Sequence, residues 1–187
     1  HHFANITLVA VLDADSGLMS PDFRSHERLG QLLTQVAGRS GRGKMAGKVI
    51  LQTHQPDHPL LEVLTQQSYS NYSKLLRKQR KQSELPPYKQ LVLVRADAAH
   101  AQNAEAFLQS ARQCAEAIFP SGETVNYLGP LPALMERRNS RHRYVLQISG
   151  GRRSDLNFLL SQLVFELEKL PMARHVRWGV DVDPQEL

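Results

Sequence analysis

One run of sequence decides the fold class: Ile6-Thr7-Leu8-Val9-Ala10-Val11-Leu12. All of its residues are apolar or β-branched, and polar residues do not alternate with apolar ones. Strands of a parallel sheet show this pattern because both of their faces are covered. The run therefore predicts a strand of a parallel sheet that is buried on both faces.

The residues that follow this run extend the α/β pattern. We expect a loop at 13–23, a helix at 26–39, a strand at 48–52 and a helix at 59–82. The first of these helices has an apolar face made of Leu29, Leu32, Leu33 and Val36. Strand, helix and strand in this order are the repeating unit of a parallel sheet. Pro86 and Pro87 stop helices and favour extended chain, so we place a domain boundary between 1–84 and 85–187.

The second half of the chain has its elements in a different order. Strands are expected at 91–96, 124–128, 143–149 and 175–182, and helices at 102–119 and from an N-cap at Ser154 to about Leu167. Tyr144 and Trp178 fall on the inward side of the alternation in their strands. The order β-α-β-β-α-β predicts a ferredoxin-like domain.

The composition is that of an ordinary folded chain with a basic bias. Of its 187 residues, 41% are hydrophobic and 22% are charged, and the net charge is +5. Basic chains favour acidic partners such as nucleic acid, and six arginines lie between Arg137 and Arg153 with no Asp or Glu among them. No apolar run approaches the roughly 20 residues of a membrane helix, so no membrane partner is expected. The single cysteine, Cys114, excludes an internal disulfide and a paired-cysteine zinc site, and it fits a reducing cytoplasm.

A second informative stretch ends the first predicted helix: Gln35-Val36-Ala37-Gly38-Arg39-Ser40-Gly41-Arg42. Gln35, Arg39 and Arg42 are spaced i, i+4 and i+7, so a helical end would aim them in one direction. Arginine at such a position stabilises charge on a γ-phosphoryl group during transfer, and Gly38 and Gly41 let the backbone approach a neighbour closely. The stretch matches Q-x-x-G-R-x-G-R and so resembles motif VI of superfamily 2 helicases.

Other motifs along the chain narrow this resemblance. They are His1-His2-Phe3, Asp13-Ala14-Asp15, Phe23-Arg24-Ser25-x-Glu27-Arg28, Gln52-Thr53-His54, Leu85-Pro86-Pro87, Leu128-Gly129-Pro130-x-Pro132-Ala133 and Asp181-Val182-Asp183-Pro184. Together they resemble the PriA family of primosomal replication-restart helicases, over essentially the whole chain. Motif VI alone indicates a helicase, whereas the later motifs indicate this family.

The resemblance implies both a function and a place within a longer enzyme. The family is made of ATP-dependent 3′→5′ DNA helicases that recognise stalled replication forks and initiate primosome assembly. Residues 1–84 would then be the end of the second RecA-like helicase lobe, and residues 85–187 the PriA-type C-terminal domain. ATP, Mg²⁺ and zinc would serve the full-length protein in the bacterial cytoplasm. The zinc ligands and the P-loop lobe are missing from this sequence, so we expect it to bind DNA and proteins without hydrolysing ATP.

The same resemblance assigns roles to individual residues. It gives catalytic roles to Gln35, Arg39 and Arg42, nucleotide contact to Gly38 and Gly41, and DNA contact to His2.

A basic loop predicts a further DNA contact from the residues themselves. Asn139 and Ser140 suit a turn, and such a turn would expose Arg137, Arg138, Arg141 and Arg143. Arginine binds phosphate through two parallel hydrogen bonds. No aromatic residue suited to stacking stands before the loop, so we expect contact with the backbone of forked and single-stranded DNA and no recognition of bases.

The resemblance also implies protein partners: the acidic C-terminal tail of the single-stranded DNA-binding protein, and other primosome proteins. The helix beginning at Ser154 would offer unpaired N–H groups to a carboxylate, assisted by Arg153, then Asn157, then Arg152. The alternative is a stand-alone adaptor whose ferredoxin-like domain binds RNA or protein. Such a module would carry aromatic residues on the outer face of its sheet, and the alternation places Tyr144 and Trp178 inward.

Overall fold

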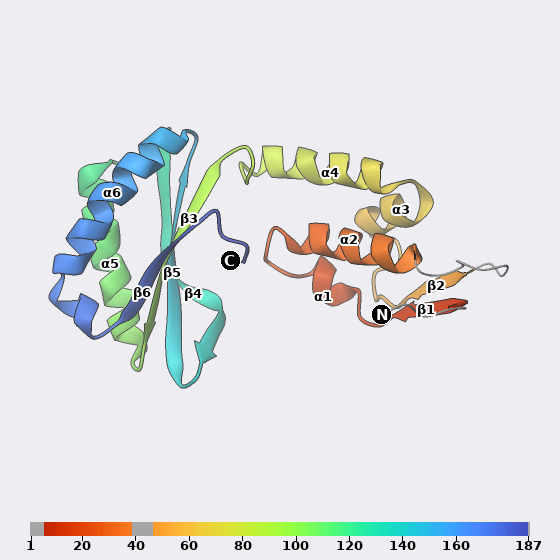
Figure 1. Cartoon of the computed structure of the whole chain (residues 1–187), viewed down its shortest axis with the longest axis horizontal. Coiled ribbons are helices and arrows are strands. Elements are labelled where there is room, and N and C mark those ends of the chain that lie inside the picture. Colours follow the sequence, from red (N-terminus) through yellow and green to blue (C-terminus); the bar gives the residue numbers. More distant parts are fainter. Residues whose placement is uncertain (1–5, 39–46, 187) are drawn as a thin grey trace. The chain divides into compact units, whose positions relative to one another are not determined.

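The computed structural model describes residues 6–38 and 47–186 of the chain (Figure 1). The chain divides into two compact units, His1–Gln82 and Ser83–Leu187. Each unit has its own cluster of buried apolar side chains. Among the helices of the described residues, none has the length and apolar character needed to cross a membrane.

The first unit contains a parallel pair of strands, β1 (Leu8–Val11) and β2 (Lys48–Leu51). The predicted parallel pairing is therefore confirmed. The prediction that this run is buried on both faces is wrong, because the side chains of Leu8 and Leu12 are 54% and 73% exposed. In the described part of the unit the sheet has only these two strands, so β1 is covered far less than a strand in the middle of a large parallel sheet.

The described residues of this unit also form four helices: α1 (Asp15–Leu18), α2 (Ser25–Ala37), α3 (Pro59–Gln66) and α4 (Tyr69–Gln82). Two predictions are corrected here. The expected loop at 13–23 contains α1, and the single helix expected at 59–82 is broken at Gln67, whose ψ of −114° is not helical. The core of the unit consists of Leu18, Leu29, Leu33, Leu60, Leu61, Tyr72 and Leu76.

Tyr72 joins α4 to α2. Its ring lies directly against Gly30, where an added Cβ would stand 2.3 Å from the Tyr72 Cε1 atom. Its hydroxyl donates a hydrogen bond of 2.5 Å to the carbonyl of His26. Burial raises the pKa of Tyr72 to about 12, so the hydroxyl keeps its proton at neutral pH.

The second unit is built from the elements β3 (Gln90–Ala98), α5 (Ala101–Ile118), β4 (Val125–Arg138), β5 (Arg141–Gly150), α6 (Arg153–Lys169), the 3-10 turn η1 (Pro171–Arg174) and β6 (Arg177–Val182). Its four strands form an antiparallel sheet in the order β4-β5-β3-β6. The protein is thus mixed α/β, with one parallel and one antiparallel sheet. The expected order of strands and helices after residue 85 agrees with the structure.

Helices α5 and α6 lie on one face of this sheet (Figure 1). Their apolar sides meet Val92, Val94, Leu146 and Ile148, which point to the same face from β3 and β5. Tyr127 fixes β4 to the end of α5, because its hydroxyl donates to the Phe119 carbonyl at 2.7 Å. Burial raises the pKa of Tyr127 to about 12.

Most boundaries in this unit differ from the predictions by one or two residues, and two differences bear on the site. β4 continues to Arg138, well beyond the end predicted at Leu128. The N-cap of α6 is Arg152, and Ser154 lies inside the first turn, where its hydroxyl bonds to Asp155. Arg152 has the extended backbone of an N-cap residue but makes no side-chain cap.

Candidate nucleic-acid interface

The basic hairpin formed by β4 and β5 is the strongest candidate site of the second unit. Asn139 and Ser140 connect the strands, with φ of +51° and +59°. Two consecutive residues with positive φ form the tight hairpin turn that matches the twist of the flanking strands. Arg138 pairs across the turn with Arg141, so the arginines are concentrated at the tip of a defined hairpin.

The four hairpin arginines are not equivalent. Arg137 and Arg138 are exposed, and neither forms an ion pair with an acid in the part of the chain that the structure describes. Arg141 donates from Nη2 to the carbonyl of Asp97 at 2.8 Å. Arg143 lies with its Nε 3.6 Å from Asp97 Oδ1, and only 22% of its side chain is exposed.

Asp97 on β3 also belongs to this site, although the sequence analysis did not predict it. It pairs in register with Arg143 on one side and Arg177 on the other, so its carboxylate lies among cations on the sheet face away from the helices. An ion pair with Asp97 lowers the positive charge that Arg143 offers to a phosphate. The available charge of the hairpin is therefore concentrated on Arg137 and Arg138.

β4 reaches the hairpin by an irregular path. Its register with β5 shifts once between Leu128 and Leu131 and again between Pro132 and Arg137. In the second shift the segment 133–136 stands opposite the single residue Arg143. The extra residues bulge out of the ladder and cannot pair with β5.

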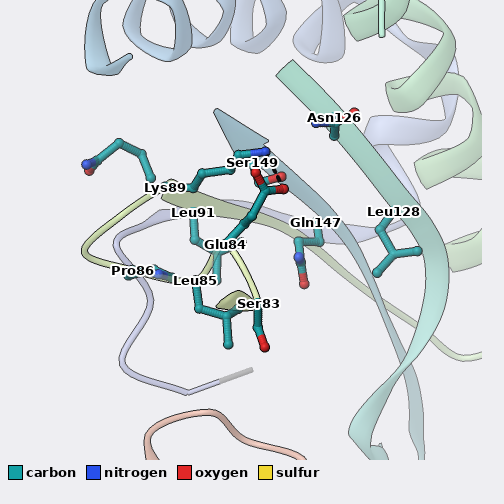
Figure 2. Close-up of a pocket in the computed structure, with 11 residues that line it drawn as sticks. Ser83, Glu84, Leu85, Pro86, Lys89, Leu91, Asn126, Leu128, Gln147 and Ser149 are labelled. Atoms are coloured by element: carbon teal, nitrogen blue, oxygen red, sulfur yellow. Dashed lines mark hydrogen bonds and ion pairs between the residues drawn. The ribbon is translucent and has the colours of Figure 1, made fainter. Parts of the chain in front are cut away.

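A polar cavity of about 360 Å³ lies at the other end of the same sheet face (Figure 2). The segment 83–90 forms one wall, and side chains of β4 and β5, among them Asn126 and Gln147, form the other. Lys89 and Glu84, both in the first wall, form an ion pair of 2.7 Å. Because the charges of this pair offset each other, the cavity offers no unbalanced charge that would select an anionic ligand.

The candidate partner site at the start of α6 is also partly neutralised. Arg152 pairs with Asp155 at 3.1 Å, and Arg153 approaches Asp183 with Nη2 and Oδ2 3.6 Å apart. Arg153 keeps 68% of its side chain exposed, and Asn157 is exposed one turn further on. The structure thus brings the three predicted residues to one helix end, together with Asp183, which the sequence analysis did not include.

Most of the residues to which the family resemblance gives catalytic, nucleotide-contact or DNA-contact roles lie outside the described parts of the chain. His2, Arg39, Gly41 and Arg42 fall outside the described residues 6–38 and 47–186. Gln35 is exposed in the last turn of α2, and Gly38 follows that helix and donates its N–H to the Thr34 carbonyl at 3.0 Å. The helix therefore ends at the glycine of the motif, close to where it was expected to end.

Two of the quoted motifs meet in the first unit. Asp15 accepts hydrogen bonds from the Thr53 hydroxyl at 2.5 Å and from the backbone N–H of His54 at 2.9 Å. The Nδ1 atom of His54 lies 2.6 Å from the same carboxylate. The Thr53 hydroxyl and then the His54 N–H lower the pKa of Asp15 to about 2, since both stabilise the charged form. The cluster ties the segment after β1 to the segment after β2.

Two further observations bear on the class of the site. In the described parts of the chain, no group of three or more His, Cys, Asp or Glu side chains could hold a metal ion. Tyr127, Tyr144 and Trp178 all stand in register with residues of the helix-covered face, and Trp178 packs on Phe107 at 5.7 Å between ring centroids. The hairpin therefore resembles a phosphate-binding surface more than a base-stacking sheet.

Comparison with known proteins identifies the family to which the chain belongs. Residues 81–185 match the family described as the primosomal protein N C-terminal domain, and the chain belongs to this family. The chain is 39% identical over 187 residues to the replication restart protein PriA of Haemophilus influenzae, covering 100% of this chain and 25% of that protein.

Two further relatives carry the same name. The PriA proteins of Synechocystis and Bacillus subtilis are 36% and 33% identical to this chain, and each match covers 97% of it. The matches cover 21% and 22% of those proteins, so the chain spans about a quarter or less of the length of these relatives. The resemblance to PriA inferred from the motifs is confirmed.

Proposed function

We propose that this chain is the DNA-contacting and partner-binding part of a replication restart helicase. The observation that carries the proposal is the hairpin with the exposed arginines Arg137 and Arg138 at its tip, which form no ion pair within residues 6–38 and 47–186. Two guanidinium groups on a rigid turn can bind phosphates without ordering a flexible loop, and they give affinity without sequence preference.

The binding experiment compares two matched removals of charge. Arg137→Ala with Arg138→Ala should weaken binding to forked and single-stranded DNA by about tenfold at low salt, measured by fluorescence anisotropy. Arg77→Ala with Lys78→Ala removes two exposed cations from α4 and should have less than half of that effect on the logarithm of affinity. Equal losses would mean that overall charge, and not the hairpin, holds the DNA.

Within the longer enzyme we propose an ATP-dependent 3′→5′ DNA helicase that acts at stalled replication forks in the cytoplasm and initiates primosome assembly. The parallel pair β1 and β2, with the motif VI residues 35–42 between the two strands in the sequence, supports assigning 1–84 to the end of a RecA-like lobe. The order β-α-β-β-α-β with strand order β4-β5-β3-β6 supports a ferredoxin-like plan for 85–187. ATP, Mg²⁺ and zinc are proposed for the longer enzyme only.

The proposed catalytic residues are tested in that longer enzyme. Arg39→Ala or Arg42→Ala should lower ATP turnover by orders of magnitude and leave DNA affinity nearly unchanged, because an arginine finger acts on the transition state. The 187-residue chain alone should show no DNA-stimulated ATP hydrolysis. A DNA affinity that fell as far as turnover would contradict the assignment.

The proposed protein partner is the acidic tail of the single-stranded DNA-binding protein. The Arg153–Asp183 separation of 3.6 Å is long for an ion pair, so a carboxylate of the tail could displace Asp183. Arg153→Glu in the full-length protein should weaken tail-peptide binding, and Asp183→Asn should strengthen it, by calorimetry. Peptide affinity that responds to neither change would remove α6 from consideration.

A further inference from the structure

The bulge in β4 carries an exposed apolar pair that the phosphate contacts do not use. Leu134 and Met135 are 53% and 56% exposed, although they lie within an element of the sheet. Single apolar side chains on a surface are ordinary, but here Leu131, Leu134 and Met135 give three exposed large apolar side chains within five residues.

We propose that Leu134 and Met135 form an apolar wedge that packs against the exposed base pair at a branch point of DNA. Arg137 and Arg138 would hold the phosphates beside that base pair. The proposal rests on the proposed DNA binding of the hairpin and assigns to the same site a preference for branched DNA.

Charge complementarity selects DNA as the occupant. The two arginines follow the apolar pair within three residues, and a chain spans at most about 3.6 Å per residue, so the apolar contact and the phosphate contact lie within one or two nucleotides of each other. Glu136 is the only acid in the segment from Leu131 to Arg143. DNA offers a row of phosphates beside the flat faces of its bases, so this one ligand can make both contacts.

The preference for a branch point follows from the free energy needed to break a stacked base step. Leucine and methionine are among the side chains that proteins insert against base steps, and the insertion does not depend on sequence. Inside a continuous duplex the insertion must break a stacked step. At a fork the last base pair already exposes one face, so the same contact is made without that cost.

The bulge geometry suits this role. The second register shift lifts the segment 133–136 out of the ladder, while Pro132 before it and Arg137 after it remain paired with β5. Ala133 is buried and fixes the start of the segment. The pair is therefore presented from a fixed base and not from a long flexible loop.

The experiment uses the whole chain and three DNA probes: a single strand, a duplex closed by a hairpin loop at each end, and a fork with 2-aminopurine in the last base pair before the junction. The variant is Leu134→Ser with Met135→Ser. Its matched control is Phe158→Ser with Phe165→Ser, which removes two exposed apolar side chains from α6. Thermal unfolding shows that each variant is folded, and Leu134→Ala with Met135→Ala replaces the serine variant if that variant unfolds.

The wedge predicts a loss of about fivefold to tenfold in affinity for the fork and losses below twofold for the single strand and the closed duplex. It also predicts loss of the 2-aminopurine fluorescence increase on binding to the fork. The α6 control should leave all of these values unchanged. Equal losses on fork and single strand, or no loss on the fork, overturn the wedge. If Arg137→Ala with Arg138→Ala weakens binding in the same assay while the apolar variant does not, the wedge fails and the proposed DNA-binding function stands.

Discussion

The unequal environments of the hairpin arginines give a quantitative prediction for the salt dependence of DNA binding. Each phosphate neutralised on duplex DNA contributes about 0.9 to the slope of log affinity against log salt. Arg137→Ala with Arg138→Ala removes two exposed cations and should reduce the slope by about 1.8. Across a fourfold range of salt, the double variant should therefore lose about tenfold less affinity than the wild type.

Arg141→Ala with Arg143→Ala should reduce the slope by about 0.9 or less, although it also removes two charges. Arg141 is bonded to the Asp97 carbonyl and Arg143 lies beside the Asp97 carboxylate, so less of their charge reaches a phosphate. Asp97→Asn provides the complementary test, because it frees Arg143 and should steepen the slope by up to about 0.9.

Fluorescence anisotropy titrations at salt concentrations from about 50 to about 200 mM measure these slopes. Circular dichroism checks that Arg141→Ala, which loses a partly buried hydrogen bond, is folded. Equal reductions from the two pairs would show that Asp97 does not screen the second pair. A slope that Asp97→Asn leaves unchanged would refute the reasoning independently.

Three further predictions concern stability. Gly30→Ala should lower the free energy of unfolding by about 1–3 kcal/mol in denaturant titrations, because the added Cβ would overlap the Tyr72 ring. A rise in the free energy of unfolding, as expected from the better helix propensity of alanine alone, would contradict this contact. Tyr127→Phe should cost about 1 kcal/mol at pH 7. In the wild type, the share of stability that depends on this hydroxyl is complete below pH 10 and is lost as the pH rises toward 12, because the folded pKa lies above the ordinary value of 10. Asp15→Asn should lower the unfolding midpoint at pH 7. The wild type loses the stability that this carboxylate contributes as the pH falls from 3.8 toward 2, because the pKa of Asp15 in the folded state is lowered to about 2, and the variant should lack this loss.

The sequence predicted the elements well where apolar spacing is regular. The core between the sheet and its two helices could be predicted from the regular spacing of apolar residues such as Phe107, Leu146 and Leu163. Motif patterns, not periodicity, identified the family. The break between α3 and α4 could not be predicted, because neither Gly nor Pro marks Gln67 and the apolar spacing continues across it.

The length of β4 was missed because Gly129, Pro130 and Pro132 usually end a strand. They are tolerated here since β4 is an outer strand that pairs only with β5, so a missing N–H on the open side breaks no ladder bond. The role of Asp97 was missed for another reason. It is separated from Arg141 by 44 positions, and only the register of β3 with β5 brings the two together.

The irregular course of β4 also bears on how copies of this chain behave toward one another. A straight outer strand of 14 residues would present a long row of unpaired N–H and C=O groups, to which a strand from a second molecule could add. Pro130 and Pro132 lack N–H groups, and the two register shifts divide the row into short, differently directed pieces. A divided row is a poorer template for a foreign strand than a straight one, so the features that shape the hairpin also protect this edge of the sheet against edge-to-edge aggregation.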